Sequence, residues 1–398
     1  DGRVSALLIE MKNKFDDDID ENPFNFEDFE VEDINFEDVP TDIQKVAEFV
    51  KELPLLNPRE IFAELEKLGY KGQDEQRKAL SLMGYRHVRR LKRIHVEGVD
   101  RKDLPTKQNV LMIGPTGCGK TYMVELLFQS IFKIPTVIVD ITSFTESGYV
   151  GDSVNTILTR LVLHADGNPH LAECGVICLD EFDKLASSGS SARFAGQGTT
   201  KDVSGYGVQR ELLAMLQGTT VTVPMDYGFS EFGYRAEIST QDIPFVVCGA
   251  FSGFEEILKE NRSNIGFQQK NQTDAEILTE QEAQSFQRFG FLPELIGRFS
   301  RIVSFPKLAH EVLRQILAEN ILPQFQNEFA GEGLKLNVTD EAIDFIVKRC
   351  EKRGTGARGL QTELISSVES AAFETFGAET SGEILIKSDG EKLISEVK

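Results

Sequence analysis

The chain has 398 residues, enough for two or three domains, and its 40% hydrophobic and 27% charged residues are typical of a globular protein. The net charge of −21 argues against nucleic acid as a partner, because binding to phosphate backbones needs a basic surface. No apolar stretch approaches the length of a membrane span, so we expect no membrane partner either.

Acidic residues are concentrated near the N-terminus. Residues 16–42 contain thirteen acidic side chains and no basic one, and phenylalanines stand at positions 24, 26 and 29. We expect residues 1–45 to form an acidic, flexible leader. It is either a solvated segment or a docking segment that places its phenylalanines on a partner or on the body of the protein.

The five cysteines do not have metal-site spacing. Cys174 and Cys178 form one pair, and no second pair follows at the spacing of a zinc site; the others are Cys118, Cys248 and Cys350. Reduced, mostly buried thiols in a cytoplasmic compartment are therefore the expectation.

The chemistry begins at residues 114–121, which read Gly-Pro-Thr-Gly-Cys-Gly-Lys-Thr. An expected strand over 110–113 precedes them and an expected helix over 120–131 follows, which is the context of a phosphate-binding P-loop. Glycines let backbone N–H groups turn toward phosphate oxygens, and the helix N-terminus adds partial positive charge. Lysine supplies a point charge to the phosphates, and the threonine hydroxyl is a Mg²⁺ ligand. The predicted nucleotide-binding residues are Gly114, Pro115, Thr116, Gly117, Cys118, Gly119, Lys120 and Thr121.

A second acidic motif follows the apolar run 175–179. Asp180, at the end of this expected strand, can hold Mg²⁺ through water, and Glu181 can orient and deprotonate the attacking water. Thr121 and Asp180 are thus the predicted metal-binding residues. A nucleoside triphosphate and Mg²⁺ are therefore the expected substrate and cofactor.

Short apolar strands alternate with helices up to about residue 305. We expect strands over 136–140, 175–180 and 244–248, and helices over 58–68, 74–95, 154–164 and 208–216, with a mobile loop over 186–207. This alternation predicts a parallel sheet covered on both faces. From residue 306 the pattern predicts a smaller, mainly helical domain, with helices over 309–329, 339–353 and 358–376 and short strands over 334–338 and 383–387.

Several motifs together resemble the ClpX family of AAA+ unfoldases, which feed the ClpP peptidase. They include the P-loop, Gly148-Tyr-Val-Gly151, Leu179-Asp-Glu-Phe-Asp-Lys184, Pro293-Glu-Leu-Ile-Gly-Arg298 and Gly354-Thr-Gly-Ala-Arg358. The resemblance runs from about Leu53 to the C-terminus. It implies an α/β fold with a large P-loop AAA+ domain over 46–305 and a small, mainly helical AAA+ lid domain over 306–398.

The resemblance also implies a homohexameric ring with ATP at the subunit interfaces. Arg298 would reach the nucleotide of a neighbouring subunit, and Arg358 would sense the nucleotide of its own subunit. With Glu181 these are the predicted catalytic residues, because guanidinium groups stabilise charge on the γ-phosphate. Tyr70 and Gln73 would also contact the nucleotide.

The family pattern further implies two pore loops and a docking loop. Tyr149 and Val150, flanked by glycines, match the first pore loop, where a large aromatic side chain on a mobile hinge can grip unfolded or tagged protein substrates. Val203, Ser204 and Tyr206 match the second. Ile265, Gly266 and Phe267 match the loop that docks onto a ClpP-type peptidase.

The zinc-binding N-terminal domain of the family has no counterpart in these 398 residues: it is either replaced by the acidic segment or lost by truncation, which leaves adaptor recruitment open. Our functional prediction is an ATP-driven protein unfoldase and translocase that is not itself a peptidase. A peptidase-independent chaperone or remodelling ring is the alternative. HslU, a related unfoldase, is disfavoured because residues 151–180 leave no room for its inserted domain, and a DNA-remodelling ATPase is disfavoured by the charge.

Overall fold

The computed structural model describes residues 41–145, 152–186, 205–224, 235–263, 283–377 and 382–397. The chain divides into two compact units, Asp1–Thr41 and Asp42–Lys398. Several predictions fall outside the described residues and stay predictions. They are the acidic leader up to residue 40, Tyr149 and Val150, Val203 and Ser204, and the tripeptide Ile265, Gly266 and Phe267.

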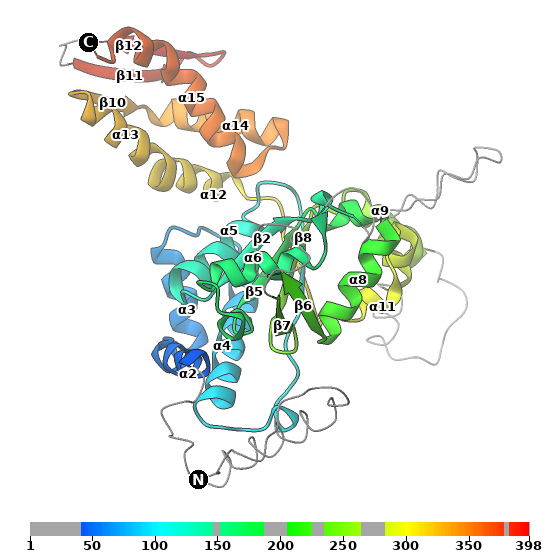
Figure 1. The fold of residues 1–398 in the computed structure, drawn as a ribbon. Helices are drawn as coiled ribbons and strands as arrows, with labels where there is room; N and C mark the ends of the chain where they lie inside the picture. The colour runs from blue at the N-terminus through cyan, green and yellow to red at the C-terminus, as the bar shows by residue number, and fades with distance from the viewer. Residues whose placement is uncertain are drawn as a thin grey trace, which may run out of the picture. The chain divides into compact units, whose positions relative to one another are not determined.

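A five-stranded parallel sheet forms the centre of the larger unit (Figure 1). Its order is β2 (Thr136–Asp140), β5 (Val176–Asp180), β8 (Phe245–Gly249), β1 (Val110–Ile113) and β9 (Arg301–Ser304). Strand β1 therefore lies between β8 and β9, with Met112 opposite both Cys248 and Val303. The first four strands were predicted, and β9 was not.

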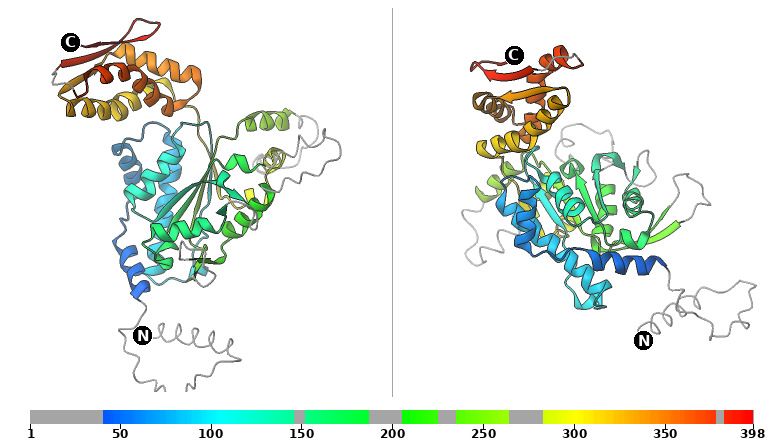
Figure 2. Two further views of the ribbon diagram at one scale, coloured as in Figure 1. Left: turned by 45° about the horizontal axis from the view of Figure 1, so that its top comes forward. Right: turned by 90° about the vertical axis from the view of Figure 1, so that its left-hand side faces the viewer.

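Helices cover both faces of this sheet (Figure 2). Alternate side chains of each strand enter different cores, as the pleat requires: Leu111 packs in one, and its neighbours Val110 and Met112 pack in the other. The Leu111 core is completed by α6 (Thr156–His164), α8 (Gly205–Gln217) and α11 (Pro293–Ile296). The Met112 core is completed by α2 (Thr41–Glu52), α3 (Pro58–Lys67), α4 (Asp74–His95) and α5 (Lys120–Val124). The predicted α/β fold is confirmed.

At the start of α3, the local sequence satisfies free N–H groups of the helix. At α3, the Asn57 side chain accepts hydrogen bonds from the backbone of Arg59 and Glu60, and Glu60 accepts one in return from the Asn57 N–H. Pro58 occupies the first helical turn, where its missing N–H costs nothing. Such a capping box contributes about 1 kcal/mol.

Two expectations need refinement. The helix expected over 120–131 has the correct extent, but from Glu125 to Ile131 it winds as a wider π-helix (η5), and Phe132 N–H bonds Leu127 O at 3.2 Å. The second expectation, a mobile loop over 186–207, is wrong for its last three residues, since α8 begins at Gly205. Gly205 and Gly207 are buried and small enough to pack in the first turn of this helix. Residues 187–204 lie outside the described part.

Shorter elements connect these parts. They are η4 (Arg101–Asp103), η6 (Ile141–Ser143), β3 (Phe144–Thr145), β4 (Asp152–Ser153), α7 (Pro169–Ala172), η7 (Phe182–Leu185), β6 (Thr220–Pro224), β7 (Arg235–Ser239) and α9 (Phe254–Ser263). β6 and β7 form an antiparallel pair, and β3 pairs with β4 in parallel across the segment that carries Tyr149.

The C-terminal part has a core of its own. A helical stretch formed by α12 (His310–Gln315), η8 (Ile316–Ile321) and α13 (Leu322–Gly331) packs with α14 (Asp340–Arg353) and α15 (Gly356–Thr375). Strands β10 (Leu334–Val338), β11 (Gly382–Ser388) and β12 (Leu393–Val397) form a three-stranded sheet beside them. β12 was not predicted. Among all described helices, none is long and apolar enough to cross a membrane.

Candidate nucleotide-binding site

The loop over residues 114–121 leaves the carboxyl end of β1 and enters α5. Gly117 and Gly119 have φ angles of +75° and +90°, a region that side chains with a Cβ rarely occupy. Gly114 is needed for a different reason, since a Cβ there would lie 2.3 Å from the carbonyl oxygen of Phe305. The loop is therefore built in a conformation that only these glycines allow.

Lys120 lies inside the curve of the loop. Its side chain is only 8% exposed, and its Nζ donates to the carbonyl oxygens of Gly114 at 2.6 Å and Pro115 at 2.9 Å. Within the described residues no carboxylate pairs with this ammonium group. A buried cation without a paired carboxylate is suited to a phosphate, because the phosphate would supply the missing negative charge.

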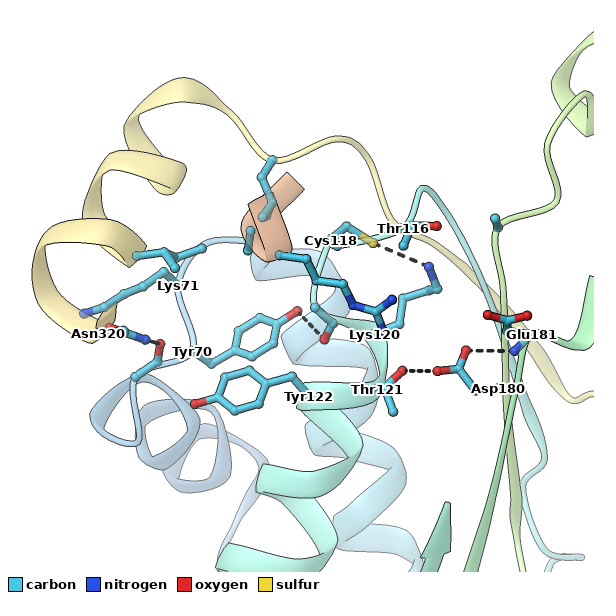
Figure 3. Close-up of a pocket in the computed structure, with 18 of the residues that line it drawn as sticks. Tyr70, Lys71, Thr116, Cys118, Lys120, Thr121, Tyr122, Asp180, Glu181 and Asn320 are labelled. Atoms are coloured by element: carbon cyan, nitrogen blue, oxygen red, sulfur yellow. Dashed lines mark hydrogen bonds between the residues drawn. The ribbon is translucent and has the colours of Figure 1, made fainter. Parts of the chain in front are cut away.

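Thr121 and Asp180 meet beside the loop (Figure 3). The Thr121 hydroxyl donates to Asp180 Oδ2 at 2.7 Å, and Asp180 Oδ1 accepts from the Glu181 backbone N–H at 2.8 Å. A hydroxyl and a carboxylate this close are hard oxygen donors of the kind that Mg²⁺ prefers. The donor set therefore fits the predicted cation.

Glu181 is exposed and has a φ angle of +55°, which is unusual for a residue with a side chain. Asp183, the next acidic residue of the same motif, links the segment after β5 to the end of β8. Its Oδ1 accepts a hydrogen bond from the Ala250 N–H at 3.0 Å. Asp180, Glu181 and Asp183 all line one pocket with Lys120. The acidic motif thus faces the P-loop.

This pocket has a volume of about 420 Å³ and is lined by both the P-loop and the C-terminal part of the chain. The Ala357 N–H, at the start of α15, donates to the Gly117 carbonyl at 2.9 Å. A Cβ on Gly356 would lie 2.6 Å from that same carbonyl oxygen, so a glycine allows this close approach. Arg358 follows directly, lines the pocket and is exposed to solvent.

The end of the pocket away from Asp180 is formed by aromatic and amide groups (Figure 3). Tyr70 donates to the Gly119 carbonyl at 3.3 Å and stacks on Tyr122, with ring centroids 6.1 Å apart. Asn320, from the C-terminal part, donates to the Gly69 carbonyl at 2.6 Å, and Lys71 pairs with Glu319 nearby. Flat rings and an amide beside a phosphate site can accommodate a nucleotide base.

Cys118 occupies the centre of the loop. It is buried, and burial raises the pKa of its thiol, although Lys120 nearby acts in the opposite direction. The Lys120 Nζ lies 3.8 Å from the Cys118 sulfur. A protonated, buried thiol behaves as a small packing residue. All five cysteines are free and buried.

Four of the predicted nucleotide-binding and catalytic residues do not line this pocket: Gly114, Pro115, Gln73 and Arg298. The Gln73 amide donates to the Pro306 carbonyl at 2.9 Å and so holds the segment that joins β9 to α12. Arg298 lies at the end of α11, with an exposed side chain beside Gln217, whose amide oxygen can accept from both Nη2 and Nε. Tyr206, predicted for the second pore loop, is exposed in the first turn of α8.

Other lining residues were not predicted. Tyr122 could have been predicted as a lining residue, because it directly follows Thr121. Lys71, Leu308, Ile316 and Asn320 come from distant segments, and no sequence spacing brings them to a P-loop.

Comparisons with known proteins agree with this geometry. Residues 106–302 match the family model of the AAA domain (Cdc48 subfamily), and residues 308–379 match that of the C-terminal, D2-small domain of ClpB protein. The chain is 35% identical over 317 residues to the ATP-dependent Clp protease ATP-binding subunit ClpX of Azotobacter vinelandii, covering 76% of this chain and 70% of that protein. It is 37% identical over 324 residues to the ATP-binding subunit ClpX 3 of Methylococcus capsulatus, covering 76% and 73%.

The fold and the site therefore define an AAA+ ATPase, in which a P-loop and an acidic strand end are joined by a small C-terminal domain. It binds ATP and hydrolyses it, and it is not a peptidase. More narrowly, the chain belongs to the ClpX family of AAA+ unfoldases.

Proposed function

We propose that this protein is an ATP-driven unfoldase and translocase that works as a homohexameric ring and threads substrate proteins into a ClpP-type peptidase. The observation that carries the proposal is the pocket shared by the two AAA+ parts of the chain. Residues of the P-loop and of α15 are in direct contact there, through Gly117 and Ala357. Hydrolysis or release of the phosphates can therefore shift the contact between the P-loop and α15, and with it the orientation of the two AAA+ parts.

We assign the hydrolytic roles as follows. Lys120 binds the β- and γ-phosphates, and Glu181 takes the proton of the attacking water. Thr121 and Asp180 would hold Mg²⁺, which neutralises charge on the phosphates when bound. Arg358 lies close enough to contact the nucleotide of its own subunit, as its place in the pocket lining supports.

Arg298 has a different role in this proposal. It is exposed and does not line the pocket of its own chain, which supports a role at the nucleotide of a neighbouring subunit. Its backbone carbonyl accepts a hydrogen bond from the buried Asn109 side chain at 3.1 Å, so its position is fixed to the core. In a ring with head-to-tail contacts, every site would receive one such arginine.

The remaining site assignments concern the pore loops and the docking loop, of whose predicted residues the structure describes only Tyr206. Tyr149 and Val150 would grip unfolded or tagged substrates, with Val203, Ser204 and Tyr206 forming the second pore loop. Ile265, Gly266 and Phe267 would dock onto the peptidase. We also propose a leader over 1–45, a large domain over 46–305 and a small domain over 306–398, a cytoplasmic location, and no partnership with membranes or nucleic acid.

Degradation of a fluorescent protein substrate tests the peptidase partnership. The chain, a ClpP-type peptidase and ATP should degrade the substrate, and deletion of residues 265–267 should abolish degradation while ATP hydrolysis continues. Unfolding that continues without any peptidase dependence would favour the alternative, a chaperone or remodelling ring. The family relatives are named as subunits of the Clp protease, which is why we place the peptidase partnership first.

A further inference from the structure

A second cavity, of about 440 Å³, lies between the later turns of α4 and residues 104–108. It shares no lining residue with the nucleotide pocket. Lys107 and Pro244, which line it, precede β1 and β8 at their amino ends, whereas the P-loop follows the carboxyl end of β1. The two cavities therefore lie at opposite ends of the same strands.

The lining of this cavity is strongly basic although the whole chain carries a charge of −21. Four arginines and one lysine contribute to it, and no lining residue is acidic; the five are Arg86, Arg89, Arg90, Arg93 and Lys107. Spacings of three and four residues place the arginines of α4 on one side of the helix.

Two carboxylates partly compensate this charge. Glu97 pairs with Arg89 at 2.7 Å and with Arg93 at 3.8 Å, and Asp242 pairs with both Arg90 and Arg101. Arg86 forms no ion pair with any residue that the structure describes. The cavity therefore keeps an excess of positive charge, which favours an anionic ligand.

The deeper cations are held in fixed positions. Arg90 donates to Asp242 Oδ1 through Nε at 3.0 Å and Nη2 at 2.7 Å, and its Nη1 bonds the Pro105 carbonyl. Lys107 Nζ donates to the carbonyl oxygens of Met215 at 3.1 Å and Thr240 at 2.6 Å. Burial lowers the pKa of Lys107 to about 7, so a bound anion would restore its charge.

The rest of the wall is apolar. Met83, Leu104 and Pro244 are buried and contribute to the lining, and Tyr85 is half-buried beside them. The volume is in the range of small-molecule sites. Basic groups with apolar and aromatic surface suit a ligand that has both an anionic group and an apolar body.

We propose that this cavity is a binding site for a small organic phosphate, that is, a phosphate ester with an aromatic or apolar body. The arginines and Lys107 would bind the phosphate group, and Met83, Leu104 and Tyr85 would contact the body. Nothing in the ATPase mechanism uses these residues, so the site is additional to the nucleotide pocket.

Calorimetric titration of the full chain with phenyl phosphate tests this site. The chain should carry Lys120→Ala, so that the P-loop does not compete for phosphate. We expect saturable binding at low salt that is tighter than for inorganic phosphate and that weakens as salt is added. The double variant Arg86→Gln and Arg93→Gln should weaken binding about tenfold or more, since each removes a charge-assisted contact. Neither change disturbs the buried pair of Arg90 and Asp242.

Arg59→Gln is the matched control, because Arg59 is an exposed arginine of α3 outside the cavity, and it should leave binding unchanged. If Lys120→Ala destabilises the chain, the titration can use the wild-type protein saturated with a non-hydrolysable ATP analogue. Absence of saturable binding, or equal binding by the double variant, would overturn the proposal. The proposal would also be overturned if inorganic phosphate bound as tightly as phenyl phosphate, or if the site bound a phosphate-free acidic peptide and not phenyl phosphate.

Discussion

At the scale of single residues, the site depends on a few groups whose chemistry follows from their surroundings. Lys120 is a buried ammonium group held by carbonyls, and Asp180 is a carboxylate held by Thr121 and by the Glu181 N–H. Glu181 differs from both because its carboxylate is exposed at the edge of the pocket. It is therefore the carboxylate that is open to a water molecule.

Replacing Glu181 by glutamine should separate ATP binding from ATP hydrolysis. The amide cannot accept a proton, so steady-state hydrolysis should fall by about a hundredfold or more, while the Lys120 site still binds nucleotide. Phosphate release and binding of a fluorescent ATP analogue measure the two steps. Glu341→Gln, at an exposed glutamate in the first turn of α14, serves as a control with unchanged hydrolysis. Rapid hydrolysis by Glu181→Gln would contradict the assignment of Glu181 as the base.

His87 predicts how the stability of the fold depends on pH. It is buried, and its Nε2 lies 3.0 Å from the Cys174 carbonyl, to which the neutral ring can donate. Burial lowers its pKa from 6.5 to about 4. The unfolded chain therefore binds the extra proton first, and stability falls as the pH drops from about 6.5 toward 4.

The expected loss from this one group is about 3 kcal/mol across that interval. Denaturant unfolding at pH 7 and pH 4.5 measures it, with His87→Gln for comparison, because glutamine can donate to the same carbonyl but does not titrate. The wild type should lose more stability than His87→Gln by about 2–3 kcal/mol. Equal losses would show that His87 does not cause the acid sensitivity.

At the scale of elements, the approach of α15 to the P-loop joins the two AAA+ parts beside the phosphate-binding loop. Two glycines near the start of α15 separate the effect of this contact from the effect of backbone strain. Gly354 and Gly356 both have positive φ angles, of +67° and +58°. A Cβ on Gly354 would meet nothing within 4 Å, whereas one on Gly356 would lie 2.6 Å from the Gly117 carbonyl oxygen.

Gly356→Ala should therefore raise the KM for ATP about tenfold, because the start of α15 must move away from the loop. Gly354→Ala should lower stability by about 1 kcal/mol through backbone strain, with little change in KM. Steady-state ATPase assays and thermal melting measure both variants. Equal effects on KM would mean that strain, and not the contact with Gly117, matters for nucleotide binding.

The elements differ in how well sequence predicts them. Strands β1, β2, β5 and β8 are short apolar runs beside helical patterns, so their hydrophobicity locates them. β9 escaped prediction because only two of its four residues are apolar and it lies at the sheet edge; β12, with three apolar residues of five, also lies at the edge of its sheet.

The site shows the same division. Loop motifs carry their own chemistry within a few residues, so the P-loop, Asp180 and Glu181 could be predicted from sequence and lie together in the structure. Asn320 reaches the pocket only through the packing of the C-terminal part, whereas Lys71 directly follows the predicted Tyr70. Gln73 was predicted to contact the nucleotide but does not line the pocket, and its contact with Pro306 could not be predicted because that segment is 233 residues away in sequence.

At the scale of the whole molecule, the separation of Arg298 from its own pocket predicts that active sites are shared between subunits. Chains with Arg298→Ala and chains with Glu181→Gln should each be nearly inactive as ATPases. In mixed rings, a site with Glu181 from one chain and Arg298 from its neighbour would be complete. Random mixing at equal amounts should restore about a quarter of the sites, since each heterologous interface joins one chain to the next.

ATPase activity measured before and after mixing the two variants tests this arrangement. Size-exclusion chromatography confirms that the mixed chains assemble, and a mixture of Glu181→Gln with wild type serves as the reference. If mixing restores no hydrolysis although the chains co-assemble, Arg298 acts in its own subunit or not at all.

The most direct measurement of the central claim is ATP-driven unfolding of a stable fluorescent protein that carries an unstructured tail, followed as loss of fluorescence with a ClpP-type peptidase present. We predict that fluorescence falls with the wild-type chain and ATP, and that it stays constant without ATP or with Glu181→Gln. Sustained ATP hydrolysis by the wild-type chain with no loss of fluorescence would contradict the account.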